Sequence, residues 1–327
     1  MASNVVKKTY EEKLLVRGKA PIDFIKKSKI FFCISTTIIL IGLICNCIFG
    51  TTLDIQFSGG SMLKYSYTGE VNTADIEAIV SKNVENANIN VSTSTGIVDN
   101  ENVNMLNIQF TGAEATSTDF DNITKDIQNA YKDNNFVSLQ ESSVDASMGL
   151  NFFLKCLCAV AIASALMVLY VTLRFKKIGG LSAGTFGVVA LLHDVAIIYF
   201  FYVIFRLPID SSFIAVALMI LGYSLNDTVV VYDRIREERK NLGAKAKVED
   251  VFNVATTKVI RRTIITSITT ISAVLVVYIV ASIYGLDSVK AFALPMIIGL
   301  VSGCYSSICI AGPLWVMWQN RKSKNEQ

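Results

Sequence analysis

The stretch FIAVALMILGYSLNDTVVVY, residues 213–232, decides the class of fold. Asp227 is its only acidic residue. About 20 predominantly apolar residues are enough for a helix to cross the hydrocarbon core of a bilayer. Five other stretches have the same apolar character: 30–49, 151–173, 181–205, 264–284 and 292–318. The sequence therefore predicts an α-helical polytopic membrane protein with six transmembrane helices.

The composition of the whole chain agrees with this class. Hydrophobic residues make up 52% of the 327 positions and charged residues only 17%, whereas soluble domains contain about 25% charged residues. A charged segment, 1–29, precedes the first span, and that span is too long for the apolar part of a cleavable signal peptide. We therefore interpret it as a signal anchor.

Basic clusters predict the orientation. They lie before the first span, after the second, between the fourth and fifth, and after the sixth, which places all of them on one side of the membrane. By the positive-inside rule this side is the cytoplasm, so both termini are expected there. The expected segments are a cytoplasmic N-terminal segment 1–29, transmembrane helix 1 at 30–49, an extracytoplasmic domain 50–147, transmembrane helices 2–6 within 148–318 with a cytoplasmic loop 233–262, and a cytoplasmic tail 319–327.

The charge of the chain is divided unevenly. Residues 51–147 carry 14 acidic and 4 basic residues, a net charge of −10, and the rest of the chain carries +13, although the overall charge is only +3. Because topology explains the basic residues, we expect membrane lipid around them and no nucleic acid as a partner.

The outward segment has a mixed pattern. Alternating apolar residues predict strands at 53–67, 88–95, 103–111 and 136–145, and helical periodicity predicts helices at 73–86 and 116–133. The order βαββαβ predicts an α+β ferredoxin-like domain. The segment contains no His, Cys or nucleotide-binding loop, so we predict a binding or mechanical module with no enzyme activity and no cofactor. All seven cysteines lie within predicted spans, where small apolar side chains are favoured over metal ligands; no metal is expected.

Ionisable groups inside the membrane are costly and are functional hypotheses by default. The third span contains His193 and Asp194, the fourth contains Asn226 and Asp227, and Arg262 begins the fifth. Asp227 is expected ~7–8 Å from the cytoplasmic end of its span and Asp194 ~20 Å from the same surface, from the helical rise. We therefore expect the long side chain of Arg262 to reach Asp227, and water to bridge any contact between the two acids.

Burial raises the pKa of a carboxyl group and a neighbouring cation lowers it, so a carboxyl group held between these influences can exchange its proton when helices move. The alternative is a static polar clamp between helices, and for His193 a simple interhelical hydrogen bond. In the sixth span Gly299, Gly303 and Ser307 recur every four residues, which predicts a face for close helix packing.

One motif connects these residues with a known family. The stretch GYSLNDTVVVYDRIRE, 222–237, resembles the fourth-span signature of the SecF family, accessory subunits of the bacterial Sec protein translocase. Further matches are Arg174-Phe175, His193-Asp194-Val195, the stretch RTIITS at 262–267 and the stretch YSSICIA at 305–311.

The resemblance implies a fold of the resistance–nodulation–division type in a multi-pass protein of the bacterial cell membrane. It implies a SecD partner, work with the SecYEG channel, and use of the proton-motive force in late steps of preprotein translocation. It also implies that Asp227 and Arg262 form a proton-relay pair, with Asn226 and Asp194 as neighbours.

The sequence departs from the family at the junction between domain and membrane. Where the family has Asp-Phe-x-Gly-Gly, this chain has Gln56 before Phe57, Gly59 and Gly60, with an acid two places earlier at Asp54. Two other functions remain open: half of a proton-coupled small-molecule exporter of the same superfamily, and a structural scaffold of the translocon that conducts no protons. An Asp227→Asn substitution separates the three functions. Proton-dependent export would be lost for a Sec subunit driven by protons, drug tolerance would change for an exporter, and neither would change for a scaffold.

Overall fold

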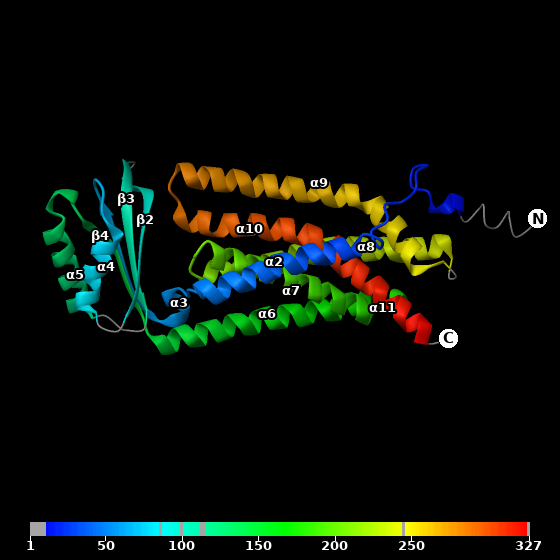
Figure 1. Ribbon diagram of the computed structural model, residues 1–327, viewed down its shortest axis with the longest axis horizontal. Coiled ribbons are helices and arrows are strands. Elements are labelled where there is room, and N and C mark those ends of the chain that lie inside the picture. The colour runs from blue at the N-terminus through cyan, green and yellow to red at the C-terminus, as the bar shows by residue number, and fades with distance from the viewer. Residues whose placement is uncertain (1–10, 85–86, 99–100, 112–115, 244–245, 326–327) are drawn as a thin grey trace, which may run out of the picture.

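The computed structural model is elongated, with a small sheet domain at one end and a bundle of long helices filling the rest (Figure 1). It describes residues 11–84, 87–98, 101–111, 116–243 and 246–325. Residues 1–10, 85–86, 99–100, 112–115, 244–245 and 326–327 of the predicted segments lie outside these ranges. The beginning of the described chain and its last helix both lie at the end of the bundle opposite the sheet.

Six helical segments are long and apolar enough to cross a membrane, as predicted. Their bounds are α2 (Ser28–Phe49), α6 (Ala146–Arg174), α7 (Gly180–Ile204), α8 (Ser211–Leu242), α9 (Val248–Ile283) and the pair α10 (Asp287–Ser306) and α11 (Gly312–Asn325). Side-chain carboxylates cap two of them: Asp145 accepts from the Ser147 N–H before α6, and Asp210 accepts from the Phe213 N–H before α8. Such caps satisfy backbone donors that have no partner within the helix.

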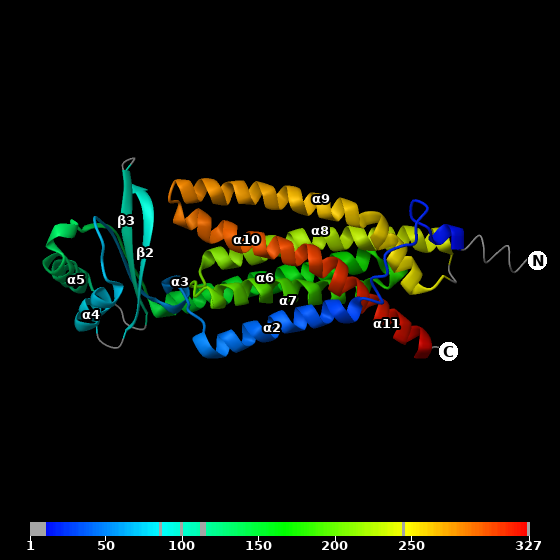
Figure 2. The ribbon, with the colours of Figure 1, turned by 45° about the horizontal axis from the view of Figure 1, so that its top comes forward.

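The helices form an inner and an outer set. Half or more of the apolar windows of α7, α8 and α10–α11 is buried, whereas α2, α6 and α9 are mostly exposed along theirs. Figure 2 shows α2 and α9 at opposite margins of the bundle. Polar groups on the buried faces of the inner helices are therefore enclosed by this chain itself.

The segment 233–262, predicted as a cytoplasmic loop, is helical for most of its length. Helix α8 continues to Leu242 and α9 begins at Val248. Glu238, only 1% exposed, pairs with Arg234 at 2.7 Å one turn away and with Lys258 of α9 at 2.8 Å. The charges that indicated a loop are thus spaced for helical ion pairs, which support a helix beyond the bilayer.

The sixth span is interrupted by one π-helical segment, η3 (Ser307–Ala311), between α10 and α11. Pro313 follows it. A proline lacks the N–H of the helical ladder and its ring clashes with the carbonyl four residues earlier, here that of Cys309. Widening of the preceding turn accommodates this clash.

The outward domain has the predicted order of elements. Strands β1 (Gly60–Tyr67), β2 (Asn88–Val98), β3 (Glu101–Thr111) and β4 (Val137–Val144) alternate with α4 (Thr73–Asn83) and α5 (Ser117–Ala130) in the order βαββαβ. The sheet order is β2-β3-β1-β4, with antiparallel neighbours throughout. Both helices cover the face of the sheet that points away from the bundle. Leu63, Ile76 and Ile123 are among the fully buried residues of the core between them.

The strand predicted from residue 53 begins only at Gly60. Residues Ile55–Ser58 form instead a single helical turn, α3, because the Asp54 side chain accepts from the Gln56 N–H and caps it. The described part of the N-terminal segment packs on the start of α9. There Phe24 is buried beside Phe252, with ring centroids 6.4 Å apart, and its N–H donates to the Asn253 side chain at 3.1 Å.

Candidate functional site: a buried acid network in the helix bundle

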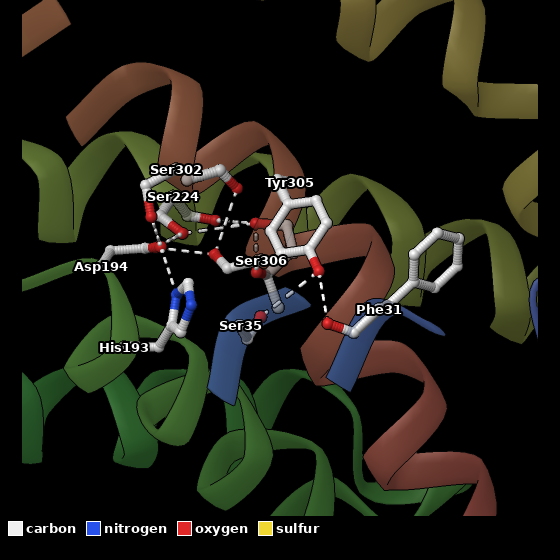
Figure 3. Close-up of polar contacts among 11 residues, drawn as sticks. Phe31, Ser35, His193, Asp194, Ser224, Ser302, Tyr305 and Ser306 are labelled. Carbon is white, nitrogen blue, oxygen red and sulfur yellow. Dashed lines mark hydrogen bonds and ion pairs between the residues drawn. The ribbon is translucent and has the colours of Figure 1, made fainter. Parts of the chain in front are cut away.

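Asp194 lies on α7 at the centre of the bundle and is completely buried. Three serine hydroxyls donate to its carboxylate (Figure 3). Ser302 donates to Oδ1 at 2.6 Å, and Ser306 and Ser224 donate to Oδ2 at 2.7 and 3.0 Å. Ser302 and Ser306 lie one turn apart on α10 and Ser224 lies on α8, so one acid connects three inner helices. A buried carboxylate requires such donors to replace its lost water.

The network continues from Ser224 along α8. Ser307 donates to the Ser224 carbonyl at 3.2 Å, its hydroxyl lies 3.3 Å from that of Ser224, and Thr228 donates to it at 3.2 Å. Each hydroxyl both donates and accepts, so its proton can turn from one neighbour to the next. The arrangement is a chain of hydroxyl groups between Asp194 and Thr228.

His193 joins this network to the first helix. Its Nδ1 lies 3.2 Å from Oδ1 of Asp194, and its buried Nε2 has no hydrogen-bond partner. Its ring centroid is 6.3 Å from that of Tyr305, whose hydroxyl donates to the Phe31 carbonyl at 2.7 Å and accepts from Ser35 at 3.3 Å. These contacts tie α2 to α10 beside the acid (Figure 3).

Asp227 lies on α8 one turn after Ser224 and is 3% exposed. Its Oδ2 is buried without a hydrogen-bond partner. Arg262 of α9 is exposed, and among the described residues the two form no ion pair within 4.0 Å. Asn226 points to the exposed side of the helix. The predicted relay residues therefore divide into a buried acid and two groups on the outer face of this chain.

Ser224 relates the positions of the two acids. It donates to Asp194 of α7 and precedes Asp227 on α8 by three residues, a rise of ~4.5 Å. The level of Asp194 in the bundle is therefore about one helical turn from that of Asp227, closer than the two predicted depths imply, and hydroxyl groups lie between the acids.

The small residues of the sixth span pack inside this chain. A Cβ atom at Gly299 would lie 2.6 Å from Cγ1 of Ile220, and one at Gly303 would lie 3.3 Å from Cβ of Ser224. Ser307 is buried in the hydroxyl chain described above. The glycines bring α10 close enough to α8 for the serines of both helices to meet.

Phe57, Gly59 and Gly60 lie where the outward domain meets the bundle. The buried Phe57 ring lies 5.6 Å from that of Phe152 and 5.3 Å from that of Phe153, both on α6. A Cβ atom at Gly149 would lie 2.9 Å from the Phe57 carbonyl oxygen and from the Gly59 nitrogen. Direct backbone contact thus fixes α3 against the start of α6.

Asp54 is the acid of this junction, and the side chain of Gln56 is exposed. Besides capping α3, Asp54 accepts from Gln109 of β3 at 2.9 Å, and its N–H donates to the Ile209 carbonyl at 3.0 Å. Burial raises the pKa of Asp54 above its ordinary value, and the nearby charge of Asp210 raises it further. The hydrogen bonds from Gln56 and Gln109 lower the pKa and so oppose this rise. Asp54 thus connects the sheet, through its carboxyl group, to the loop before α8, through its backbone N–H.

Sequence reasoning did not assign a role to the serines around Asp194. The signal available was the spacing of Ser302 and Ser306 on the same side of α10 as the glycine face. Within the described part of the chain, no group of three His, Cys, Asp or Glu side chains is placed to hold a metal ion.

Comparison with known proteins places these residues in a wider context. Residues 123–321 match the family model described as protein export membrane protein SecD/SecF, C-terminal. SecF of Alicyclobacillus acidocaldarius is 31% identical over 94% of this chain and 96% of its own length. SecDF of Bacillus subtilis is 31% identical over 93% of this chain, which spans 39% of that longer protein.

The fold has a solved counterpart. The crystal structure of SecDF from Thermus thermophilus, described as a translocon-associated membrane protein, superposes with a TM-score of 0.75 at 22% identity. It covers 92% of this chain, and this chain covers 39% of it.

Proposed function

The chain belongs to the SecD/SecF family of protein export membrane proteins, as a SecF subunit, and from this premise we propose that it uses the proton-motive force to assist late steps of preprotein translocation through the SecYEG channel. Membership supports an accessory role in the Sec translocase. The use of protons is our inference, and its main support is the buried Asp227 carboxyl group with one unpaired oxygen.

The physical step proposed is a change of protonation at Asp227. Loss of its proton leaves a buried negative charge that needs a cation or water, because an uncompensated charge in an apolar interior is very costly. Arg262 of α9 is the cation that we expect to approach it. We infer that α8 and α9 move together when the proton leaves and separate when it returns. A proton driven by the membrane potential supplies about 2.3 kcal/mol per 100 mV, enough to shift a two-state bundle.

Asp194 and His193 would support this step from inside the bundle. The hydroxyl chain from Ser224 to Ser307 offers groups that can reorient as the charge at Asp227 changes. Because Asp194 already receives three hydroxyl donors, we assign it a supporting role and assign proton exchange to Asp227.

A SecD protein is the proposed partner on the outer face of α8 and α9. Asn226 and Arg262 are exposed there, and an exposed arginine close to lipid is unfavourable unless a protein surface covers it. The longer SecDF relatives, of which this chain spans about two fifths, have length for such a partner on the same polypeptide.

We propose that the outward domain is a ferredoxin-like module that contacts SecD or the emerging preprotein. Its order of elements and its sheet order β2-β3-β1-β4 support this architecture. We propose no enzyme activity and no cofactor for it. The basic ends of α2, α6 and α11 all lie at the end of the bundle away from the sheet, which supports cytoplasmic termini in a bacterial cell membrane.

The test is Asp227→Asn in cells that depend on this protein for secretion. The substitution preserves shape but removes proton exchange, so we expect proton-dependent export to be lost while the protein still assembles with SecD. The matched control is Asp233→Asn on the same helix, because Asp233 is half exposed and pairs with Arg236 at 2.8 Å. Normal export in the Asp227 variant would favour a scaffold, and altered drug tolerance with normal secretion would favour an exporter.

A further inference from the structure

A cavity of about 1000 Å³ lies at the end of the bundle opposite the sheet, away from the acid network. Residues from the turn after α6, the start of α7, the extension of α8 and the helix α11 line it. Its size is at the upper end of the range for small-molecule sites, ~300–1,000 Å³. We propose that this cavity binds one anionic phospholipid of the cytoplasmic leaflet; the choice of leaflet rests on the orientation proposed above.

The cations of the cavity fit a phosphate headgroup. Lys176, Arg239 and Lys322 come from three different elements, and no acidic side chain is among the described residues that line the cavity. The Nη1 atom of Arg239 donates to the Ala246 carbonyl at 2.7 Å, which fixes the guanidinium group in place. Basic pockets between transmembrane helices on the cytoplasmic side are typical sites for anionic headgroups.

The rest of the wall fits acyl chains, which favours an amphiphile over a water-soluble anion. Apolar atoms dominate the lining, and Leu181 and Trp318 are strongly exposed beside it. The exposed face of α7 continues from Leu181 to Val189 and Leu192 along the membrane-spanning part of the helix. The Phe186 and Trp318 rings meet at 6.0 Å at this edge, and aromatic side chains are typical of the headgroup level. An amphiphile therefore satisfies both ends of the cavity.

The protein contains its own reporter, because its two tryptophans both line this cavity. Purified full-length protein in detergent would be titrated with phosphatidylglycerol or phosphatidylcholine carrying dibrominated chains, which quench tryptophan emission on contact. We expect phosphatidylglycerol to quench at a several-fold lower mole fraction. Identical curves for the two lipids would overturn the proposal, because annular lipid makes no such distinction.

Variants separate charge from shape. Lys176→Gln should weaken phosphatidylglycerol quenching about fivefold, since each cation near an anionic lipid contributes about that factor. Lys240→Gln removes an equal charge from α8 outside the cavity and should leave the quenching unchanged. Thr185→Phe, which fills the wall, should weaken quenching by the lipid. Leu275→Phe, on the exposed side of α9 outside the cavity, should not. Equal effects of the paired variants would refute the site. Emission restored by millimolar inorganic phosphate would also refute it, because the ligand would then be a soluble anion.

Discussion

Replacement of Asp194 by alanine tests whether the serine network holds the inner helices together. The substitution removes the only acceptor shared by Ser224, Ser302 and Ser306. A hydrogen bond between transmembrane helices contributes about 0.6 kcal/mol on average and about 1.7 kcal/mol at most. Three bonds of average strength predict a loss of about 2 kcal/mol in the free energy of unfolding.

The geometry shows which bond matters most. Ser306 has a second acceptor in the Gly303 carbonyl at 3.3 Å, and Ser224 has the Ser307 hydroxyl at 3.3 Å. Ser302 forms the shortest of the three bonds, at 2.6 Å, and the described residues give it no second acceptor. We therefore expect Ser302→Ala to cost about 1 kcal/mol in the native protein but almost nothing in the Asp194→Ala background.

The assay is unfolding of the purified protein by increasing mole fraction of dodecyl sulfate, followed by circular dichroism. Asp194→Asn is the control for shape, because one amide oxygen still accepts and the serine hydroxyls can accept from the amide nitrogen; we expect it to lose less than about 1 kcal/mol. An Asp194→Ala protein within about 0.5 kcal/mol of the parent would refute the reasoning. So would additive effects of the Asp194 and Ser302 substitutions.

Two further predictions concern packing and pH. Gly299→Val should prevent close packing of α10 on α8, because a Cβ atom at this position would lie 2.6 Å from Ile220. The yield of monodisperse protein in size-exclusion chromatography should fall. Gly222→Ala should leave the yield unchanged, because a Cβ atom there would have no atom within 4 Å. Burial raises the pKa of Tyr65 from 10.0 to about 12. Between these values the folded state binds more protons than the unfolded state, so stability should fall as pH rises from 10 to about 12, by about 2–3 kcal/mol at most. In alkaline thermal melts Tyr65→Phe should lack this loss; an unchanged alkaline slope in the variant would show that Tyr65 is not its source.

The spans and the order of the outward elements could be predicted because they depend on local composition. Apolar length fixes which segments suit the bilayer, and alternation in segments such as Leu63 to Tyr67 fixes which strand faces are buried. The helical structure of most of 233–262 was not predicted from its charged residues. Glu238 shows why, because one of its partners, Lys258, lies on another helix and is invisible to local pattern.

The candidate site was predicted by residue type but not by arrangement. Asp194, Asp227 and Arg262 stand out in any apolar segment, because a membrane tolerates few ionisable groups. Which of them are enclosed depends on how far each helix is rotated about its axis. That rotation buried Asp227 and left Arg262 exposed.

By itself, the sequence determined that six segments of this chain are long and apolar enough to cross a membrane, that an acidic domain lies between the first two, and that a few ionisable groups lie within these segments. These properties follow from the chemistry of consecutive residues. Only the tertiary structure decided that serines of α8 and α10 surround Asp194 and that Asp227 keeps an unpaired oxygen. The physical reason is that hydrogen bonds act over about 3 Å. Here Gly303 lets α10 approach α8 closely enough for groups separated by many residues to come within that distance.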